Sequence, residues 1–354
     1  MMKPTGYSLV PQIEKQIKSA KCIYISAHTN ADPDALCSVL ALYNILHTKF
    51  QKKKIITNLE GVKPLNLSYL MNFNEITSVD SLEIVSKKQP DLLILMDIDS
   101  PKRITLNNFD SFSEICKKNQ LIVIDHHVQN NWPSNATYLN NILSSACEEV
   151  YNVFIKKLGY KLDIFTAEIL LSGILLETNR FLWPNKHLDK TFKVTLDLLD
   201  KGLDIEEIYN KSNRYPPCIS LIYQELFKNL TIGKGYNYSY ISDEFTEKYI
   251  MSDIIKINDF KMIIAKWTQE YLKNIEPNKA GFITYITQKS KENNMANYSV
   301  SLRSADPKIH VNDIALKLGG GGHQFSSAAR ITAKNIKEVV KKVVKKIENP
   351  QNDK

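Results

Sequence analysis

Histidine and aspartate side chains follow apolar runs of this 354-residue chain, at the points where the runs end. His28, Asp32 and Asp34 lie within seven residues, directly after Cys22–Ala27, and Asp97 ends a second apolar run. Imidazole and carboxylate together, without thiolate, suit Mn²⁺, Fe²⁺ or Mg²⁺ better than structural zinc. The residue types and their spacing therefore predict a site for divalent metals.

A third apolar run ends in Asp125-His126-His127, and Glu177 ends an apolar helical pattern. Taken alone, an aspartate at a strand end is commonly a turn residue or a helix cap, and a lone histidine commonly packs. Two adjacent histidines behind an aspartate are a rarer pattern. Burying so many carboxylates costs several kcal/mol per charge unless cations compensate them. Two metals that share one carboxylate meet this need and form the usual clamp for phosphoryl hydrolysis.

A second candidate region combines an arginine with a glycine run. Glycine backbone amides can approach an anion closely, and arginine grips a phosphate through two parallel hydrogen bonds. A glycine run alone is typical of turns, and Arg303 alone is also typical of a surface ion pair. Together they predict a phosphate-binding region. The residues expected to contact substrate are Arg303, Ser304, Gly320, Gly321, Gly322 and His323.

The elements that must position the first group alternate between strand and helix. Strands are predicted at Cys22–Ala27, Lys54–Asn58, Leu92–Asp97 and Leu121–Ile124. Helices are predicted after the cap Asp32, over Ser145–Leu158, over Asp163–Glu177 and within Lys186–Asn213. Such alternation predicts an α/β domain whose parallel sheet carries helices on both faces. Ligands bind at the carboxyl ends of such strands, which is where the histidines and aspartates fall.

The segment Arg214-Tyr215-Pro216-Pro217 interrupts the helical pattern and is the predicted domain boundary. Beyond it, strands are predicted at Tyr238–Ser242, Lys261–Thr268, Gly281–Gln288 and Tyr298–Arg303. Helices are predicted over Val311–Leu318 and Lys334–Ile347. The length of the chain suits two domains.

The composition is that of a folded soluble protein, with 43% hydrophobic and 24% charged residues. The net charge of +8 suits an anionic substrate, although an AT-rich genome also enriches lysine. Five scattered cysteines without C-x-x-C spacing indicate reduced, mostly buried thiols. No apolar run is long enough to span a membrane and no signal peptide begins the chain, so we expect a cytoplasmic protein.

The motifs, in this order, resemble the DHH/DHHA1 phosphoesterases over about residues 15–345. They are His28-x₃-Asp32-x-Asp34, Asp97, Asp125-His126-His127, Arg303-Ser304 and Gly319-Gly-Gly-Gly-His323. The resemblance implies a DHH domain with a five-stranded parallel sheet at 1–213 and a linker at 214–228. It also implies a smaller α/β DHHA1 domain at 229–354, with the active site in the cleft between the domains and two Mn²⁺ ions, or Mg²⁺ or Fe²⁺, bound there.

The resemblance assigns His28 and Asp32 to one metal and Asp34 and His126 to the other, with Asp97 as the bridge. It implies that His127 lies near the scissile phosphate, and Asp125 is interpreted as the residue that orients its neighbours. We therefore group His127, Asp97 and Asp125 as catalytic.

The family's last metal ligand is an aspartate in the pattern G-I-x-x-D-T-G, whereas this chain reads Gly173-Ile-Leu-Leu-Glu177-Thr178-Asn179. Glu177 is expected to ligate, with an altered metal spacing or preference. The family's A-A-G ending is replaced by Ala328-Ala329-Arg330.

Three functions are compatible with these residues. The first is a phosphodiesterase that hydrolyses cyclic-di-AMP or its linear product pApA to AMP. The second is a nano-RNA oligoribonuclease that also dephosphorylates 3′-phosphoadenosine 5′-phosphate (pAp). The third is a non-catalytic nucleotide-binding protein with a decayed metal site. We expect the first.

The chain has no room for the extra domains of RecJ-type exonucleases and shows no membrane segments. It carries a glycine loop that family II pyrophosphatases lack. We therefore expect a stand-alone member that acts on short adenine nucleotides, without a membrane or long nucleic acid as partner, and that by analogy forms a homodimer.

Overall fold

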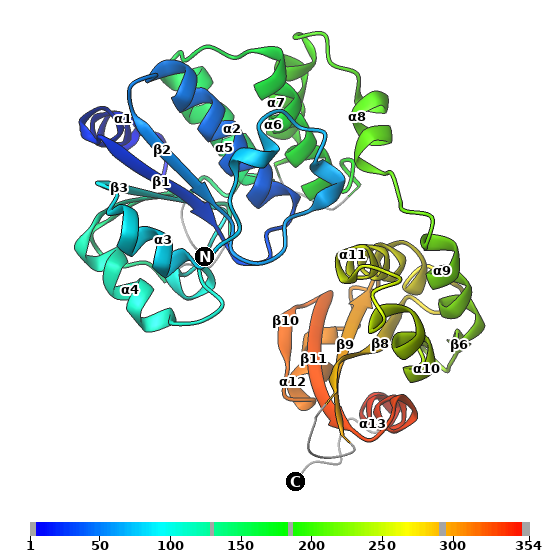
Figure 1. The fold of residues 1–354 in the computed structure, drawn as a ribbon. Coiled ribbons are helices and arrows are strands. Elements are labelled where there is room, and N and C mark those ends of the chain that lie inside the picture. Colours follow the sequence, from blue (N-terminus) through cyan, green and yellow to red (C-terminus); the bar gives the residue numbers. More distant parts are fainter. Residues whose placement is uncertain (1–4, 128–130, 183–186, 290–294, 349–354) are drawn as a thin grey trace. The chain divides into compact units, whose positions relative to one another are not determined.

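The computed structural model describes residues 5–127, 131–182, 187–289 and 295–348. The chain forms two compact units, Met1–Arg214 and Tyr215–Lys354, which are described separately (Figure 1). Residues 219–228, expected to belong to a linker, form a helix of the second unit.

The first unit is built on a parallel sheet in the order β2-β1-β3-β4-β5. Its strands are β1 (Cys22–Ala27), β2 (Lys54–Asn58), β3 (Leu92–Met96), β4 (Gln120–Ile124) and β5 (Ala136–Leu139). The apolar runs predicted the first four strands. The fifth has only four residues, too few to show a hydrophobic period, although the resemblance implied five strands.

Helices cover both faces of this sheet, because both faces of its strands are apolar. On one face, Ile23 and Ile25 of β1 belong to a core shared with α1, α2, α5 and α6. On the other face, Tyr24 joins a core shared with α3 and α4. The helices of the unit are α1 (Val10–Ser19), α2 (Pro33–Lys49), α3 (Ser81–Lys88), α4 (Phe109–Lys118), α5 (Ala146–Val150), α6 (Ile164–Glu177), α7 (Leu188–Leu199) and α8 (Ile205–Ser212). Short 3₁₀ turns are η1 (Leu65–Leu67), η2 (Phe73–Glu75) and η3 (Pro101–Arg103), and the π-helix η4 (Tyr151–Lys157) continues α5.

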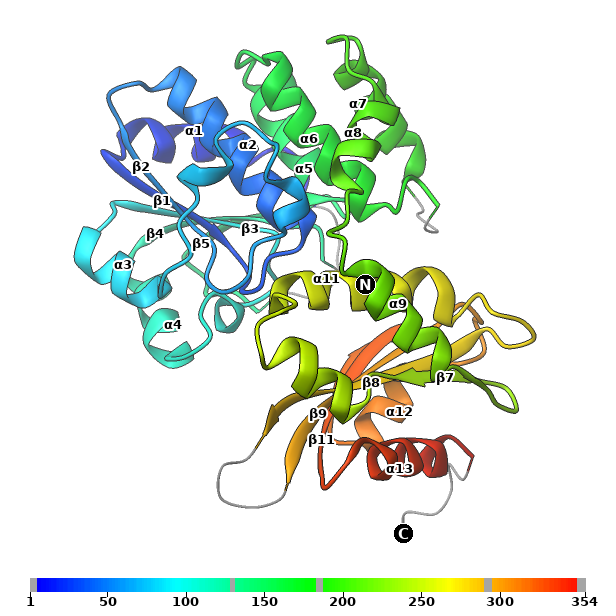
Figure 2. The ribbon, with the colours of Figure 1, turned by 45° about the vertical axis from the view of Figure 1, so that its right-hand side comes forward.

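The second unit contains a mixed sheet in the order β10-β11-β9-β8-β7-β6, in which only the β7–β8 pair is parallel among the described strands. Its strands are β6 (Thr231–Ile232), β7 (Asn237–Tyr240), β8 (Ala280–Lys289), β9 (Ala296–Ser304), β10 (Gly321–His323) and β11 (Ser326–Ala333). Its helices are α9 (Ile219–Lys228), α10 (Asp243–Phe245), α11 (Ile257–Trp267), α12 (Val311–Lys317) and α13 (Ile336–Glu348), with π-helical η5 (Thr246–Ile250) and η6 (Thr268–Leu272). Helices α12 and α13 pack on one face of the sheet and α9 and α11 on the other, and Figure 2 shows α13 beside β11.

One strand prediction in this unit is wrong. Residues Lys261–Thr268 read as a strand, but most of them belong to helix α11. The buried side chains of Phe260, Ile263, Ile264 and Trp267 recur at helical spacing, which puts them on one face against the core. The apolar run was too short for its own sequence to distinguish helix from strand.

None of the helices in the described ranges combines the length and the apolar character needed to cross a membrane. The cytoplasmic location stays a prediction.

Candidate metal centre

The turn from β1 into α2 carries three of the expected ligands. His28 follows the last residue of β1 and is buried. Asp32 is the N-cap of α2, where its Oδ1 accepts a hydrogen bond from the amide of Ala35 at 3.0 Å. Pro33 then starts the helix, and Asp34 in the first turn is fully buried. The cap role that an aspartate commonly has is therefore real for Asp32, and it leaves Oδ2 available.

Asp97 lies directly after β3 in a left-handed backbone conformation, with φ of 51°. Its amide donates to the carbonyl of Ile124 at 2.9 Å, which extends the pairing of β3 with β4 by one residue. The residue is 1% exposed, and its Oδ1 has no hydrogen-bond partner among the described residues. A buried carboxylate oxygen without a donor is costly, so strain and desolvation are both concentrated at this residue.

The two oxygens of Asp97 face two different histidines. Its Oδ2 lies 3.8 Å from Nε2 of His28, which is also 3.4 Å from Oδ2 of Asp32. Its Oδ1 lies 3.2 Å from Nε2 of His126. His28, Asp32 and Asp97 form one set of donor atoms within 4.8 Å of one another, and Asp97, His126 and His127 form the other. Asp97 is thus the residue shared by two neighbouring donor sets.

Backbone carbonyls fix the tautomers of the two histidines. Nδ1 of His28 lies 3.0 Å from the carbonyl of Thr29, and Nδ1 of His126 lies 3.3 Å from the carbonyl of Leu143. A carbonyl oxygen only accepts, so each Nδ1 carries the proton in a neutral ring and each Nε2 presents its lone pair to the carboxylates. This is the usual arrangement of metal-binding histidines in proteins.

His127 is oriented differently. Its Nδ1 lies 3.7 Å from Oδ1 of Asp97, but it donates to Oδ1 of Asp125 at 2.7 Å. Burial raises the pKa of Asp125, yet the hydrogen bond and charge of His127 outweigh burial and leave that pKa lowered. Asp125 is therefore ionised and holds the proton on Nδ1 of His127. That nitrogen has no free lone pair for a metal.

Asp34 is anchored by a distant part of the chain. Its Oδ2 accepts from the amide of Ala146 at 2.6 Å and its Oδ1 from the amide of Cys147 at 3.1 Å. Both amides belong to the first turn of α5, where they lack helical partners. Oδ2 also lies 3.8 Å from Nε2 of His126. Each carboxylate oxygen has a second lone pair, so the anchoring leaves Asp34 able to bind a metal.

Glu177 ends α6 and belongs to the same group of charges. Burial raises its pKa well above the usual value, and the negative charges of Asp32 and Asp34 raise it further. The structure therefore brings the glutamate into the electrostatic field of the expected ligands, without an ion pair in the described residues to neutralise it.

The site holds more negative charge than the protein compensates. Burial, followed by the charge of Asp97, raises the pKa of Asp34 to about 7. Burial lowers the pKa of His126, but the close carboxylate of Asp97 and the charge of Asp34 leave it raised well above its usual range. Protons therefore neutralise part of this negative charge, and bound divalent cations would neutralise it as well. The orphaned Oδ1 of Asp97, the two Nε2 lone pairs and the oxygen-rich donor set all fit a pair of divalent cations.

Sequence reasoning missed two residues that hold this site in place. The hydroxyl of Tyr138 donates to Oδ2 of Asp125 at 3.2 Å. The side-chain amide of Asn140 donates to the carbonyl of His127 at 2.7 Å and to the hydroxyl of Tyr138 at 2.8 Å. Both residues lie on or just after the short strand β5, whose pattern carried no signal. The sequence offered one clue besides the hydrophobic pattern, namely a tyrosine and an asparagine close together after the histidine pair.

Arg303 lies on β9 of the second unit, at the end where Ser304 closes the strand. Burial lowers the pKa of its guanidinium, and Nη1 donates to the carbonyl of Leu302 at 2.9 Å. No carboxylate of the described chain forms an ion pair with it. Lys273, which the sequence did not single out, lies close enough that its pKa is lowered by burial and then by the charge of Arg303. Arg303 and Lys273 thus bring two positive charges close together in the second unit.

The structure brings only some of the other residues expected to contact substrate close to Arg303. Ser326 of β11 is the register partner of both Arg303 and His323, so the latter two are aligned two strands apart along the backbone. The side chain of His323 lies outside the described part of the structure. The hydroxyl of Ser304 donates to the carbonyl of Asp306 at 3.1 Å and accepts from its amide at 3.0 Å, so it closes a turn.

The glycine run has a packing reason as well as the expected anion-binding one. The amide of Gly320 donates to the carbonyl of Ala315 at 2.8 Å, and a Cβ at that position would lie 2.1 Å from the carbonyl oxygen of Ala328. Gly322 has φ of 141°, and its Cβ would lie 2.7 Å from the carbonyl oxygen of Ser326. Both glycines allow strand β10 to lie close to β11. Gly319 and Gly321, by contrast, have open space around a Cβ position.

A parallel α/β unit with this histidine–carboxylate centre, joined to a smaller mixed-sheet unit, defines a class of metal-dependent phosphoesterases. The chain matches the DHH family N-terminal domain over residues 22–174 and the DHHA1 domain over residues 248–349. It belongs to the DHH/DHHA1 phosphoesterase family.

Its relatives within the family extend over nearly the whole chain. It is 25% identical over 312 residues to the bifunctional oligoribonuclease and PAP phosphatase NrnA of Bacillus subtilis, covering 87% of this chain and 89% of that protein. The Mycoplasma genitalium protein of the same name is 25% identical over 336 residues, covering 94% of this chain and 95% of that one. In fold, the chain is similar to an exopolyphosphatase-related protein from Bacteroides fragilis, with a TM-score of 0.80, 22% identity and 100% of both chains covered.

Proposed function

We propose that the chain hydrolyses short oligoribonucleotides and removes a phosphate from pAp, using two divalent cations held around Asp97. The observation that carries this proposal is the position of Asp97, whose two carboxylate oxygens face two separate histidine Nε2 atoms. The substrate class is supported by the relatives, which are named as oligoribonucleases and PAP phosphatases. Our first expectation from the sequence, hydrolysis of cyclic-di-AMP or pApA, has no such support and stays a prediction.

The metal-binding residues in this proposal are His28, Asp32, Asp34, Asp97, His126 and Glu177. Two cations bound there, Mn²⁺ in our proposal, lower the pKa of a bound water and neutralise charge on the phosphate. The ionised Asp125 holds the proton on Nδ1 of His127, so that Nε2 is the atom left to meet the substrate. Tyr138 and Asn140 keep this pair in place.

In the second unit, Arg303 and Lys273 bind the terminal phosphate of the substrate. Arginine presents two parallel N–H donors that match phosphate oxygens, and the nearby lysine adds a second positive charge. The partly buried setting of Arg303 strengthens such an interaction relative to one in bulk water. A terminal phosphate is common to pAp and to 5′-phosphorylated short RNA, which is why one binding residue serves both substrates.

The test is a substrate panel for the purified full chain with Mn²⁺. The panel contains pAp, RNAs of two to five nucleotides, a longer RNA, pApA and cyclic-di-AMP. We expect turnover of pAp and the short RNAs and little turnover of the longer RNA. A strong preference for cyclic-di-AMP would restore the first expectation, and turnover of none would overturn the proposal.

A further inference from the structure

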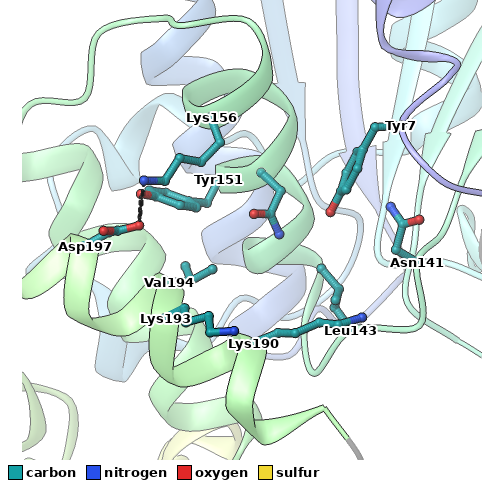
Figure 3. A pocket seen from close by; sticks show the side chains of 10 residues that line it. Tyr7, Asn141, Leu143, Tyr151, Lys156, Lys190, Lys193, Val194 and Asp197 are labelled. Carbon is teal, nitrogen blue, oxygen red and sulfur yellow. Dashed lines mark hydrogen bonds and ion pairs between the residues drawn. The ribbon is translucent and has the colours of Figure 1, made fainter.

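A pocket of about 460 Å³ lies on the first unit, outside the group of metal-binding residues. Its walls come from η4, from helix α7 and from the segments around Tyr7 and Asn141 (Figure 3). Volumes of roughly 300–1,000 Å³ are typical of sites for small ligands. Nothing in the function proposed above uses this pocket.

Positive charge dominates the lining. Lys156 of η4 and both Lys190 and Lys193 of α7 line the pocket, against the single carboxylate of Asp197. Asp197 is already engaged, because its Oδ2 lies 2.7 Å from Nζ of Lys156 and accepts from the hydroxyl of Tyr151 at 2.8 Å. The hydrogen bond from Lys156 lowers the pKa of Asp197, so this carboxylate is ionised and neutralises one lysine.

The positive charges of Lys190 and Lys193 on α7 are not neutralised by a carboxylate of the pocket. No ion pair of Lys190 exists within the described residues, and the nearest carboxylate oxygen to Lys193 is the exposed Oδ2 of Asp189, at 3.9 Å. Lys190 lies beside Asp189 in the first turn of α7, where the helix dipole is positive. Such a placement repels further cations and attracts an anion.

The remaining lining is made of neutral polar side chains and apolar surface. Figure 3 shows Tyr7 and Asn141 on the side of the pocket opposite Tyr151. The side-chain amide of Asn152 provides a polar group, whereas the amide of Asn141 already donates to Oε2 of Glu149 at 3.1 Å and the hydroxyl of Tyr151 to Asp197; Leu143 and Val194 provide apolar contacts. A few polar groups among apolar ones are typical of a site that recognises an organic ligand as well as its charge.

We propose that this pocket binds a phosphate-bearing anion no larger than a mononucleotide, with Lys190 and Lys193 as the principal charged contacts. The ligand is either free phosphate or a nucleoside monophosphate, since both present the same dianionic group. Leu143 lines the pocket, and its carbonyl oxygen lies 3.3 Å from Nδ1 of His126, so the pocket and the metal centre share this residue.

The test measures binding rather than hydrolysis, so it does not depend on the proposed function. Equilibrium dialysis of the full chain with labelled inorganic phosphate and with labelled 5′-AMP is carried out in EDTA, which removes metal-dependent phosphate binding. The variant is the pair Lys190→Gln and Lys193→Gln. The matched control is Lys87→Gln with Lys88→Gln on α3, two exposed lysines on the opposite side of the sheet.

We expect the α7 pair to weaken binding about tenfold or more, and the α3 pair to leave it within about twofold of the parent. Asp197→Asn is expected to strengthen binding roughly threefold, because it frees Lys156 from its partner. Binding should also weaken as salt is added. Tighter binding of 5′-AMP than of phosphate would identify a nucleotide as the ligand, and equal binding would identify the phosphate group alone.

Two results would overturn the proposal. One is equal affinity of the α7 and α3 variants, which would mean that the anion binds elsewhere. The other is no measurable binding of either probe to the parent chain. Circular dichroism of both lysine pairs checks that the fold is retained, which we expect because all four side chains are exposed.

Discussion

The metal centre of the first unit and the Arg303 region of the second unit carry uncompensated charge of opposite sign. Around Asp97, buried carboxylates outnumber their partners so strongly that burial and neighbouring charge raise the pKa of Asp34 to about 7. Around Arg303, burial lowers the pKa of the guanidinium, and burial followed by the charge of Arg303 lowers the pKa of Lys273. From the missing charge we expect cations as ligands in the first region and an anionic group of the substrate in the second.

The two regions also differ in burial, and from this difference we expect each region to affect a different kinetic parameter. Asp97 is 1% exposed and is held by backbone pairing between two central strands. Such rigid positioning suits interactions that are made in the transition state. Arg303 lies at the end of a sheet strand and is expected to hold a part of the substrate that does not react. Changes in the first region should therefore lower kcat, and changes in the second should raise KM.

Asp97→Asn is expected to have the largest effect. Hydrolysis should fall by roughly a thousandfold or more, because the variant weakens the residue shared by both donor sets. Asparagine tolerates the left-handed backbone at this position, so the fold should be retained. Initial rates and the Mn²⁺ content per chain measure the two consequences.

The control for this change is Asp99→Asn, two residues along the chain, which should keep activity within a few-fold of the parent. A variant at Asp97 that retained both its metal content and its rate would contradict the bridging role. If the parent chain held no metal and the Asp97→Asn variant bound nucleotide as tightly as the parent, the non-catalytic function considered from the sequence would be favoured.

Arg303→Gln is expected to raise KM by roughly 10–100-fold while kcat changes little, because a charge-assisted contact to a non-reacting phosphate is lost. Steady-state kinetics with pAp provide the measurement. Arg330→Gln, an exposed change on the neighbouring strand β11, is the control. A fall in kcat at unchanged KM would break the proposed division between the two regions.

Tyr138→Phe tests whether the support of Asp125 affects the reaction. Loss of one hydrogen bond to an ionised group should lower kcat about tenfold and leave KM unchanged. Tyr160→Phe, which removes a hydroxyl that donates to Glu14 at 3.1 Å, is the matched change away from the site. Equal kinetics for the two variants would show that Tyr138 has only a packing role.

Glu148→Gln is expected to have the smallest effect, on stability. Burial raises the pKa of Glu148 from 4.5 to about 7, and its Oε2 has no hydrogen-bond partner in the described structure. The folded state therefore holds the proton more tightly than the unfolded state, so stability falls as the pH rises from about 4.5 to about 7. Glutamine should raise the free energy of unfolding by about 1 kcal/mol at pH 8 and less at pH 5.

Urea unfolding at the two pH values measures this difference, with the exposed Glu83→Gln as the control for loss of one charge. Glutamine retains an oxygen that can accept from Thr191, whose hydroxyl lies 3.0 Å from Oε1 of Glu148. A gain of equal size at both pH values would mean that packing, and not buried charge, is responsible.

Much of the metal centre could be predicted because its residues follow recognisable apolar runs. The strands before Asp97 and Asp125 are long enough to show their character locally. The strand β5 is not, and so Tyr138 and Asn140 were missed. Lys273 was missed for a related reason, since one lysine among many carries no signal until the fold brings it close to Arg303.

The sequence by itself determined that the chain has a parallel α/β unit with acids and histidines at the carboxyl edge of its sheet. Apolar runs, helix caps and residue types are local properties, and they suffice for that conclusion. Only the tertiary structure decided which oxygen of Asp97 faces which histidine, and that Asp34 is held by amides 112 and 113 residues away. Those contacts depend on packing between distant segments, which no local pattern records.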